Sequence, residues 1–229
     1  RQKPLKVEKE KKHKEKRGRP KKSEIREPIK PTILAQQKDM QTTQEMLSLI
    51  SKECGVGIKQ NSKGNREVWI GGKLHISTVD GDIPITAIYS SANVHDSSVA
   101  LPLIGETSKK VNYLYDLQDA GYDADIIRDF SKQHGHCPII DINPKNSSVL
   151  REKIQLQEDE KKKFEFFGLR ELSDTHHYNQ RSMVERVNKY LKDDFGCDKI
   201  YYQGATKVAS VLAFGILCIC IHQSLKMIT

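Results

Sequence analysis

Apolar and polar positions become periodic only after about residue 30, and the first periodic region predicts a helix followed by a β-hairpin. Residues 31–53 begin at a proline and predict the helix. Two runs rich in β-branched residues follow, EVWIGGKLHISTV and IPITAIYSS, and they meet at Asp80 and Gly81, a strong hairpin signal. The Gly- and Asn-rich residues 55–65 predict the connection between helix and hairpin, and Asp80 and Asp82 are most simply turn residues.

The middle of the chain predicts a strand, a helix and a second strand. In NYLYDLQDAGYDADIIRDF, side chains alternate between two faces up to Asp119, Gly121 ends the strand, and Asp123 caps the helix that follows. CPIIDIN predicts the next core strand, and Asp96 caps a short helix upstream. This order implies a parallel crossover with ligands at the carboxyl ends of the strands, and Asp119 lies at such an end. The structural alternative is that Asp116, Asp119 and Asp123 only stop the strand and start the helix.

The stretch HHYNQRSMVERVNKYLKDDFG, residues 176–196, predicts a helix with two unlike faces. One face is apolar and carries Met183, Val187, Tyr190 and Leu191. The opposite face is charged, and its members lie within about 80° of one another: Tyr178, Arg181, Glu185, Lys189 and Lys192. One interpretation is a solvated face, because Arg181 and Lys189 flank Glu185 at i−4 and i+4 and form weak ion pairs. The other is that Glu185 binds a metal while the cations hold phosphates.

The C-terminal apolar run and the cysteines limit the cellular setting. Val208 to Ile221 spans about 14 residues, fewer than the roughly 20 that cross a bilayer, so it predicts a buried helix and no membrane partner. The five cysteines are scattered and form no CxxC pair, which indicates reduced thiols in a cytoplasmic protein. The cluster HGHC at 134–137 is too compact for one tetrahedral metal site and predicts a loop.

The net charge of +8 is concentrated at the N-terminus. Residues 1–30 carry 14 basic and 5 acidic side chains, a net of +9, whereas the other 199 residues have a net of −1. This composition predicts a disordered tail that binds a polyanion, with nucleic acid as the first choice and a solubilising linker as the alternative.

Within the tail, EKRGRPKK at 15–22 resembles an AT-hook. Gly18 and Pro20 favour an extended, narrow backbone. Arg17 and Arg19 are therefore expected along the floor of an A·T-rich minor groove, where the potential is most negative.

Several motifs together resemble bacterial insertion-sequence transposases of the DDE class. The pattern Tyr-x2-Arg-x3-Glu-x6-Lys, which marks the third acid of many such enzymes, occurs at Tyr178, Arg181, Glu185 and Lys192. GGKLHISTVDGDIPITAIYSSANVHDS is similar to the segment that follows their first acid, and YDLQDAGYDADIIRDFSKQHGHCPIIDINP to the one that carries the second. The basic KRGRPKK insert and the ending ATKVASVLAFGILCICIHQSL are similar as well, so the resemblance extends from about residue 10 to residue 225.

The resemblance implies an α/β fold of the RNase H-like type, a mixed sheet flanked by helices, in which acids converge on two Mg²⁺ ions that Mn²⁺ replaces. It implies that Asp119 and Glu185 are the second and third catalytic acids and metal ligands. Tyr178, Arg181 and Lys192, with Lys189 beside them, would contact DNA phosphates. The expected activity is metal-dependent cleavage at transposon ends and strand transfer into target DNA, by a homodimer at the bacterial nucleoid.

One departure from the family concerns the first aspartate, which normally stands in an Asp-Ser/Thr context on the first strand, upstream of the basic insert. No such motif occurs, and RQKPLKVEK resembles the sequence that follows it. The first acid and first strand are therefore expected just before Arg1, and this N-terminally truncated chain is expected to be inactive or nearly so. Asp80 or Asp82 is the alternative first acid.

Three regions are expected: a basic tail at 1–30, a helical insert and linker at 31–66, and an RNase H-like catalytic domain at 67–229. The alternative function is a truncated, catalytically inactive remnant of a transposase that still binds DNA.

Overall fold

A computed structural model describes residues 31–60, 64–144, 147–166 and 180–228. The chain divides into two units, Arg1–Pro31 and Thr32–Thr229, and the elements below belong to the second. The AT-hook-like segment and Tyr178 lie outside the described residues.

The predicted hairpin is confirmed. Strands β2 (Arg66–Val79) and β3 (Ile83–Ser91) pair antiparallel around Gly81 and Asp82, whose φ angles are 81° and 60°. The prediction of a connection at 55–65 is wrong, because β1 (Gly55–Gln60) pairs antiparallel with the first part of β2. The glycines of β1 allow this pairing, because a Cβ on Gly57 would come within 2.3 Å of the Trp69 ring.

The predicted strand–helix–strand unit is also confirmed. Strands β4 (Tyr115–Gln118) and β5 (Cys137–Ile140) are parallel, with η1 (Ala120–Tyr122) and α4 (Asp125–Gln133) between them. The buried core beneath this unit includes Ile127 and Ile140. Asp119 comes directly after β4, at its carboxyl end.

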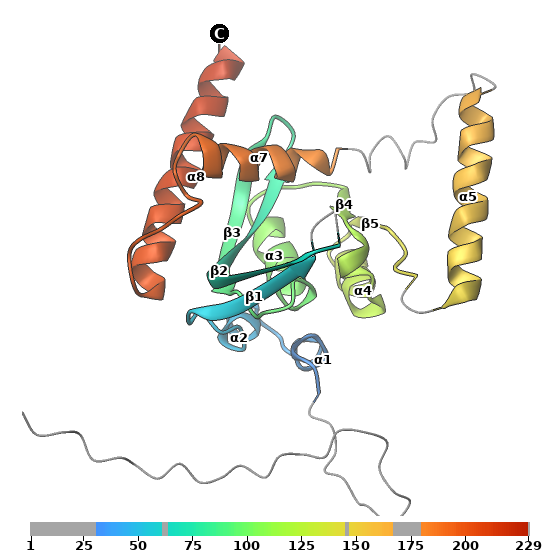
Figure 1. Ribbon diagram of the computed structural model, residues 1–229, viewed down its shortest axis with the longest axis horizontal. Helices are drawn as coiled ribbons and strands as arrows, with labels where there is room; N and C mark the ends of the chain where they lie inside the picture. Colours follow the sequence, from blue (N-terminus) through green and yellow to red (C-terminus); the bar gives the residue numbers. More distant parts are fainter. Residues whose placement is uncertain (1–30, 61–63, 145–146, 167–179, 229) are drawn as a thin grey trace, which may run out of the picture. The chain divides into compact units, whose positions relative to one another are not determined.

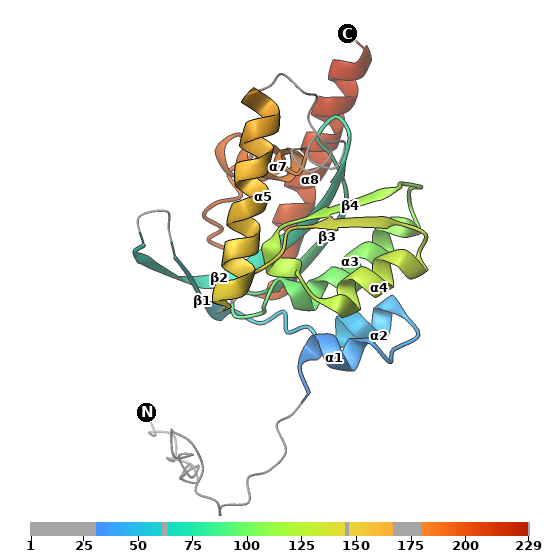
Figure 2. The same ribbon diagram turned by 90° about the vertical axis from the view of Figure 1, so that its right-hand side faces the viewer.

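Helices cover both faces of the β2–β3 pair (Figures 1 and 2). Helix α3 (Ser97–Ser108) leads from β3 towards β4 and packs with β3 through a cluster that includes Ile88 and Val99. Helices α7 (Ser182–Asp193) and α8 (Ala205–Ile228) pack in a second cluster around Ile76. Since Ile88 pairs with His75, and His75 and Ile76 are neighbours in β2, the two clusters lie on opposite faces.

Three further helices complete the described chain. The single helix expected at 31–53 is in fact two short ones, α1 (Ile33–Gln37) and α2 (Thr43–Ser48), each capped by a threonine. The buried amide of Gln37 joins them to α3 by donating to the carbonyls of Met46 and Ser98, at 3.2 and 2.9 Å. Helix α5 (Ser148–Phe166) follows β5.

Two predicted helix caps differ from the structure. Asp96 is the N-cap residue of α3 but makes no capping hydrogen bond, and the ring of His95 accepts from the Ser97 amide instead. Asp123 does not cap α4, because its carboxylate receives hydrogen bonds from Arg128 and the Asn143 amide. The Asp123 carboxylate thus bonds to Arg128 within α4 and to Asn143, 20 residues away, and not to the first-turn amides of α4.

The C-terminal helix also differs from the prediction. It spans 24 residues and is the one described helix long and apolar enough to cross a membrane, yet only 22% of its apolar window is buried. The expectation of a buried helix is therefore correct for one face only.

The fold is mixed α/β and consistent with an RNase H-like fold, but β2 and β4 belong to separate sheets, of three antiparallel and two parallel strands. From Gly72 to Val79, β2 pairs with β3 alone among the described strands.

Candidate active site

Asp119 lies at the carboxyl end of β4 with its carboxylate exposed. Its Oδ1 accepts a hydrogen bond from the Gly121 amide at 2.9 Å, which starts the η1 turn. Only one carboxylate oxygen is used in this way, and Oδ2 has no hydrogen-bond partner within the described part of the chain. The turn therefore orients the carboxylate and leaves an oxygen available to a ligand, so the structural and functional interpretations of Asp119 are compatible.

Tyr122 connects the Asp119 turn to the start of α3. It packs against the core cluster that contains Ala100 and Leu101. Burial, followed by the negative charges of Asp96 and Asp119, raises the pKa of its phenol far above the ordinary value. The η1 turn at the carboxyl end of β4 therefore packs against the start of α3, close to Asp96.

A lysine from β2 also lies beside the start of α3. Lys73 Nζ donates to the Val94 carbonyl and to Asp96 Oδ1, both at 3.0 Å. The pair explains why the Asp96 carboxylate does not cap α3. Sequence reasoning missed it, because 23 residues separate the partners and no local signal relates them.

Helix α7 has the two faces that the sequence predicts. Val187 and Leu191 are buried, whereas Glu185, Lys189 and Lys192 are exposed. Arg181, one helical turn before Glu185, donates a hydrogen bond to Glu185 Oε1 at 3.1 Å. The ion pair expected of a solvated face is therefore present.

A second arginine fixes α7 to the β2–β3 turn. Arg186 Nε donates to both carboxylate oxygens of Asp82, at 3.0 and 2.8 Å, and Nη2 donates to Oδ1 at 2.6 Å. These hydrogen bonds raise the pKa of the Arg186 guanidinium above its ordinary value. Asp82 thus has a structural role, which argues against it as a substitute for a first catalytic acid.

The donor chemistry of the site suits a hard cation, but the ligand set is incomplete. Asp119 and Glu185 supply exposed carboxylate oxygens, which Mg²⁺ and Mn²⁺ prefer. Within the described ranges no group of three or more His, Cys, Asp or Glu side chains converges on one point. Asp119 and Glu185 therefore offer ligand atoms of a suitable kind, but the described residues do not form a complete metal site.

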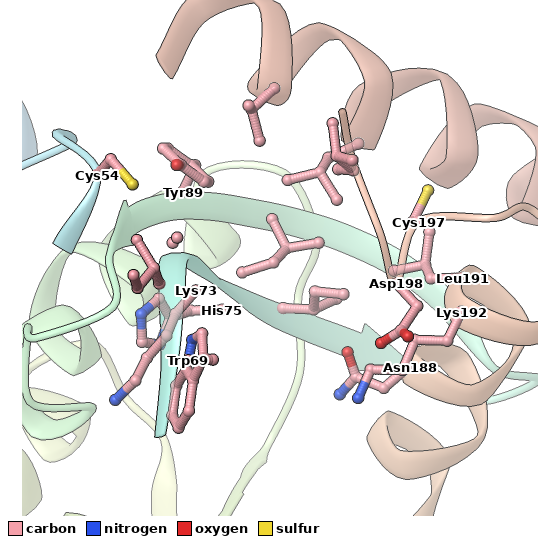
Figure 3. A pocket seen from close by; sticks show the side chains of 18 of the residues that line it. Cys54, Trp69, Lys73, His75, Tyr89, Asn188, Leu191, Lys192, Cys197 and Asp198 are labelled. Carbon is pink, nitrogen blue, oxygen red and sulfur yellow. The ribbon is translucent and has the colours of Figure 1, made fainter. Parts of the chain in front are cut away.

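A cavity of about 1140 Å³ opens beside β2, and α7 and the segment that leads into α8 line its far side (Figure 3). Its lining includes Lys73 and Asp96 from one side, Tyr122 from the Asp119 turn, and Asn188 and Lys192 from α7. Figure 3 shows Asn188 and Lys192 beside Asp198, across the cavity from Lys73 and Trp69. The cavity thus adjoins elements that carry both candidate acids.

The chain belongs to the transposases with a DDE domain. The family described as "Transposase DDE domain" matches residues 50–221, which include both Asp119 and Glu185. Among curated proteins and among solved structures, none matches the chain.

Proposed function

We propose that this transposase domain cuts phosphodiester bonds at the ends of a DNA element and transfers the resulting 3′ ends to target DNA. The observation that carries the proposal is the position of Glu185 on α7. Its carboxylate is exposed on a charged face and bonded to Arg181, while two anchors, the buried Val187–Leu191 face and the Arg186–Asp82 contact, hold the helix in place. A rigid helix that presents one acid among cations suits chemistry on a phosphate.

Two carboxylates would hold the divalent cations of the reaction. Asp119 offers Oδ2, because the Gly121 amide engages Oδ1, and Glu185 offers the oxygen that Arg181 does not engage. Mg²⁺ held there would activate a water or a DNA 3′-hydroxyl and would stabilise the leaving oxygen. Lys189, Lys192 and, outside the described residues, Tyr178 would bind the phosphates on either side of the cleaved bond.

A first acid would enter between the two sheets. The separation of β2 from β4 and the cavity beside β2 leave space for one further strand, and a strand there would carry its side chains past both the Asp119 turn and α7. We infer that this strand, with the family's first aspartate, comes from sequence upstream of Arg1. The chain without it would retain two of three acids and cut poorly.

The basic tail would increase the affinity for DNA but would not select the bond that is cleaved. Arg17 and Arg19 would insert into an A·T-rich minor groove, and the other cations of residues 1–30 would neutralise phosphates. The tail would thus hold the protein on DNA in the bacterial nucleoid.

The second candidate function is a DNA-binding remnant of a transposase that no longer cuts. It is favoured by the lack of any three-carboxylate group among the residues that the structure describes. In this case the tail and the charged face of α7 would bind DNA, and Asp119 and Glu185 would contribute only their negative charge to the surface.

The test is nicking of element-end DNA in Mg²⁺ or Mn²⁺ by three proteins: this chain, the chain extended upstream to include the first aspartate, and the extended chain with Glu185→Gln. The proposal expects cutting by the extended chain only, reduced at least about 1000-fold by Glu185→Gln, a loss of roughly 4 kcal/mol in transition-state stabilisation. Glu160→Gln on exposed α5 is the matched control and should cut normally. An extended chain that binds DNA but never cuts would establish the remnant instead.

A further inference from the structure

The outer side of α8 is an apolar surface that nothing in the described part of the chain covers. Its inner side packs on α7 and the sheet through buried Leu212, Gly215, Ile219 and Gln223. On the outer side five large apolar residues are each between 53% and 83% exposed: Phe214, Leu217, Ile221, Leu225 and Ile228. At 100° per residue these five, called here the outer stripe, lie within about 80° of one another.

The outer stripe contains no charge. Helix α8 has only two charged side chains, Lys207 and Lys226, one near each end. Lys226 turns towards the inner neighbours, with Nζ 5.5 Å from the centre of the Tyr190 ring. Soluble monomers seldom expose a charge-free apolar surface of this kind without a partner.

The spacing of the outer stripe is symmetric about its middle residue. Leu217 and Leu225 each lie four residues from Ile221, and Phe214 and Ile228 each lie seven away. The steps of three and four average 3.5 residues, the repeat with which two helices pack along a shared seam. An antiparallel copy of the same helix, related by a two-fold axis at Ile221, therefore sets every stripe residue opposite another stripe residue.

We propose that two copies of this chain associate through α8, with the two outer stripes packed antiparallel about a two-fold axis at Ile221. Ile221 then contacts Ile221 of the second copy, Leu217 contacts Leu225, and Phe214 contacts Ile228. Lys207 would project past the end of the second helix, so no like charges meet. This inference rests on the α8 surface alone and extends the proposed function by naming the surface that brings two catalytic domains together.

The size of the outer stripe is sufficient for such an interface. Five half-exposed or more exposed large side chains present roughly 500 Å² of apolar area per copy, so pairing would remove about 1,000 Å² in total, the lower bound of specific interfaces. Burial at the centre of the seam would concentrate the binding energy in few residues.

A lipid bilayer is the competing occupant, because α8 is long and apolar enough to span one. A spanning helix would have to release its inner side, where Val187, Leu191 and Ile219 are almost fully buried together. Gln223 is also buried there and would enter the hydrocarbon. A second protein copy needs only the side that is already exposed, so it is the better fit.

The first experiment measures the mass of the full chain in solution by sedimentation across a concentration series. The wild-type chain should be dimeric at tens of micromolar, and Leu217→Glu should weaken the dimer at least about 100-fold, because each copy then brings a charge into the apolar seam one turn from its centre. Met227→Glu is the matched control, since Met227 is 62% exposed on the same helix but lies off the outer stripe. Far-UV circular dichroism should be the same for all three.

A wild-type chain that stays monomeric at the highest concentration would overturn the proposal. So would a dimer that Leu217→Glu and Met227→Glu weaken equally. Co-sedimentation of a monomeric wild-type chain with phosphatidylcholine vesicles, lost in Leu217→Glu, would assign the outer stripe to lipid.

The second experiment tests the two-fold arrangement by disulfide formation, after the exposed Cys54, Cys137 and Cys218 are changed to Ser. Ile221→Cys should cross-link to itself on mild oxidation. Phe214→Cys should not cross-link alone but should cross-link when mixed with Ile228→Cys. Self-linking of Phe214→Cys would show parallel helices and contradict the proposed geometry.

These results are separable from the proposed function. In the chain extended upstream, Glu185→Gln should abolish cutting, and in either chain it should leave the dimer intact, because Glu185 lies on α7 outside the outer stripe. Failure of DNA cutting therefore says nothing against the dimer, and a monomeric chain says nothing against Glu185 as a catalytic acid.

Discussion

Helices α7 and α8 pack against the same face of the sheet, yet their outer sides are opposites. Their inner sides meet in one cluster, in which Val187, Leu191 and Ile219 surround Ile76 of β2. The outer side of α7 is charged, whereas the outer side of α8 is apolar. Packing determines only the inner side of each helix, so the outer sides are free to follow function: the charged one suits phosphates and the apolar one suits a protein surface.

Charge alone would not have distinguished a functional face from a solvated one. The Arg181–Glu185 pair is exposed and contributes little to stability, at most about 1 kcal/mol. What sets α7 apart from an ordinary surface helix is that it is held twice, by its apolar side and by Arg186 on Asp82.

The largest expected effect on the fold comes from breaking the shared inner cluster. Leu191→Ala should lower the free energy of unfolding by about 2–4 kcal/mol, because it leaves a cavity between α7, α8 and β2. Urea denaturation followed by circular dichroism measures the change. The neighbouring exposed Lys189→Ala should cost less than about 0.5 kcal/mol; equal losses from both would show that the two sides of α7 are not distinct.

The free energy of unfolding should fall at acid pH because of His75, which lies on the face of β2 opposite α7 and α8. His75 is buried beneath α3 and hydrogen-bonded to Ser90 at 2.9 Å, and burial lowers its pKa from 6.5 to about 4. Since the unfolded chain binds this proton more readily, the stability contribution is complete above pH 6.5 and is lost as the pH falls towards 4. The loss approaches about 3 kcal/mol at most.

Denaturation midpoints measured between pH 7 and 4 test this expectation. The His75→Gln variant keeps a partner for Ser90 and lacks the titrating ring, so its stability should fall less steeply over the same range. Parallel pH curves for the variant and the wild-type chain would rule out His75 as the source of the acid sensitivity.

A smaller effect is expected from the contact that fixes α7 to the hairpin turn. Arg186→Ala should reduce stability by about 1 kcal/mol, because Asp82 is mostly covered and loses a bidentate partner while Arg186 itself is half exposed. A double-mutant cycle with Asp82→Asn isolates the pair. If the two single losses add up to the loss in the double variant, the Arg186–Asp82 interaction contributes no stability of its own.

The smallest expected effect concerns the charged side of α7. Lys192→Ala should weaken DNA binding by a few-fold and lower the slope of log affinity against log salt by about 0.9, since one phosphate contact disappears. Fluorescence anisotropy with labelled duplex at several salt concentrations measures both quantities. Lys162→Ala on exposed α5 is the control; an identical change in slope would show that any surface lysine behaves in this way.

Local patterns predicted much of the fold and of the site. The alternation in β2 and β3, the turn at Asp80 and Gly81, and the strand–helix–strand unit around Asp119 all occur as predicted. The faces of α7 were predicted as well, because helical periodicity determines which residues share a side. Glycine content misled at Gly55–Gln60, where the Trp69 ring needs the space that a side chain would occupy.

Contacts between distant residues could not be predicted. The Lys73–Asp96 and Arg186–Asp82 pairs join residues 23 and 104 positions apart. The first pair takes the Asp96 carboxylate from its predicted capping role, and the second gives the turn residue Asp82 an additional role as an anchor for α7. A carboxylate binds whichever donor the fold brings nearest, and a single sequence does not reveal that donor.

By itself, the sequence determined the β2–β3 hairpin, the strand–helix–strand unit that ends β4 at Asp119, the exposed side of α7 that carries Glu185, and membership of the DDE transposases. These depend on periodicity and motif spacing, which are local properties of the chain. Only the tertiary structure decided that Asp82 anchors α7, that β2 and β4 stand in separate sheets, and that one side of the apolar α8 remains uncovered. Burial depends on the packing of the whole chain. Hydrophobicity predicts that burial of a residue is favourable, but only the fold determines whether another part of the same chain buries it.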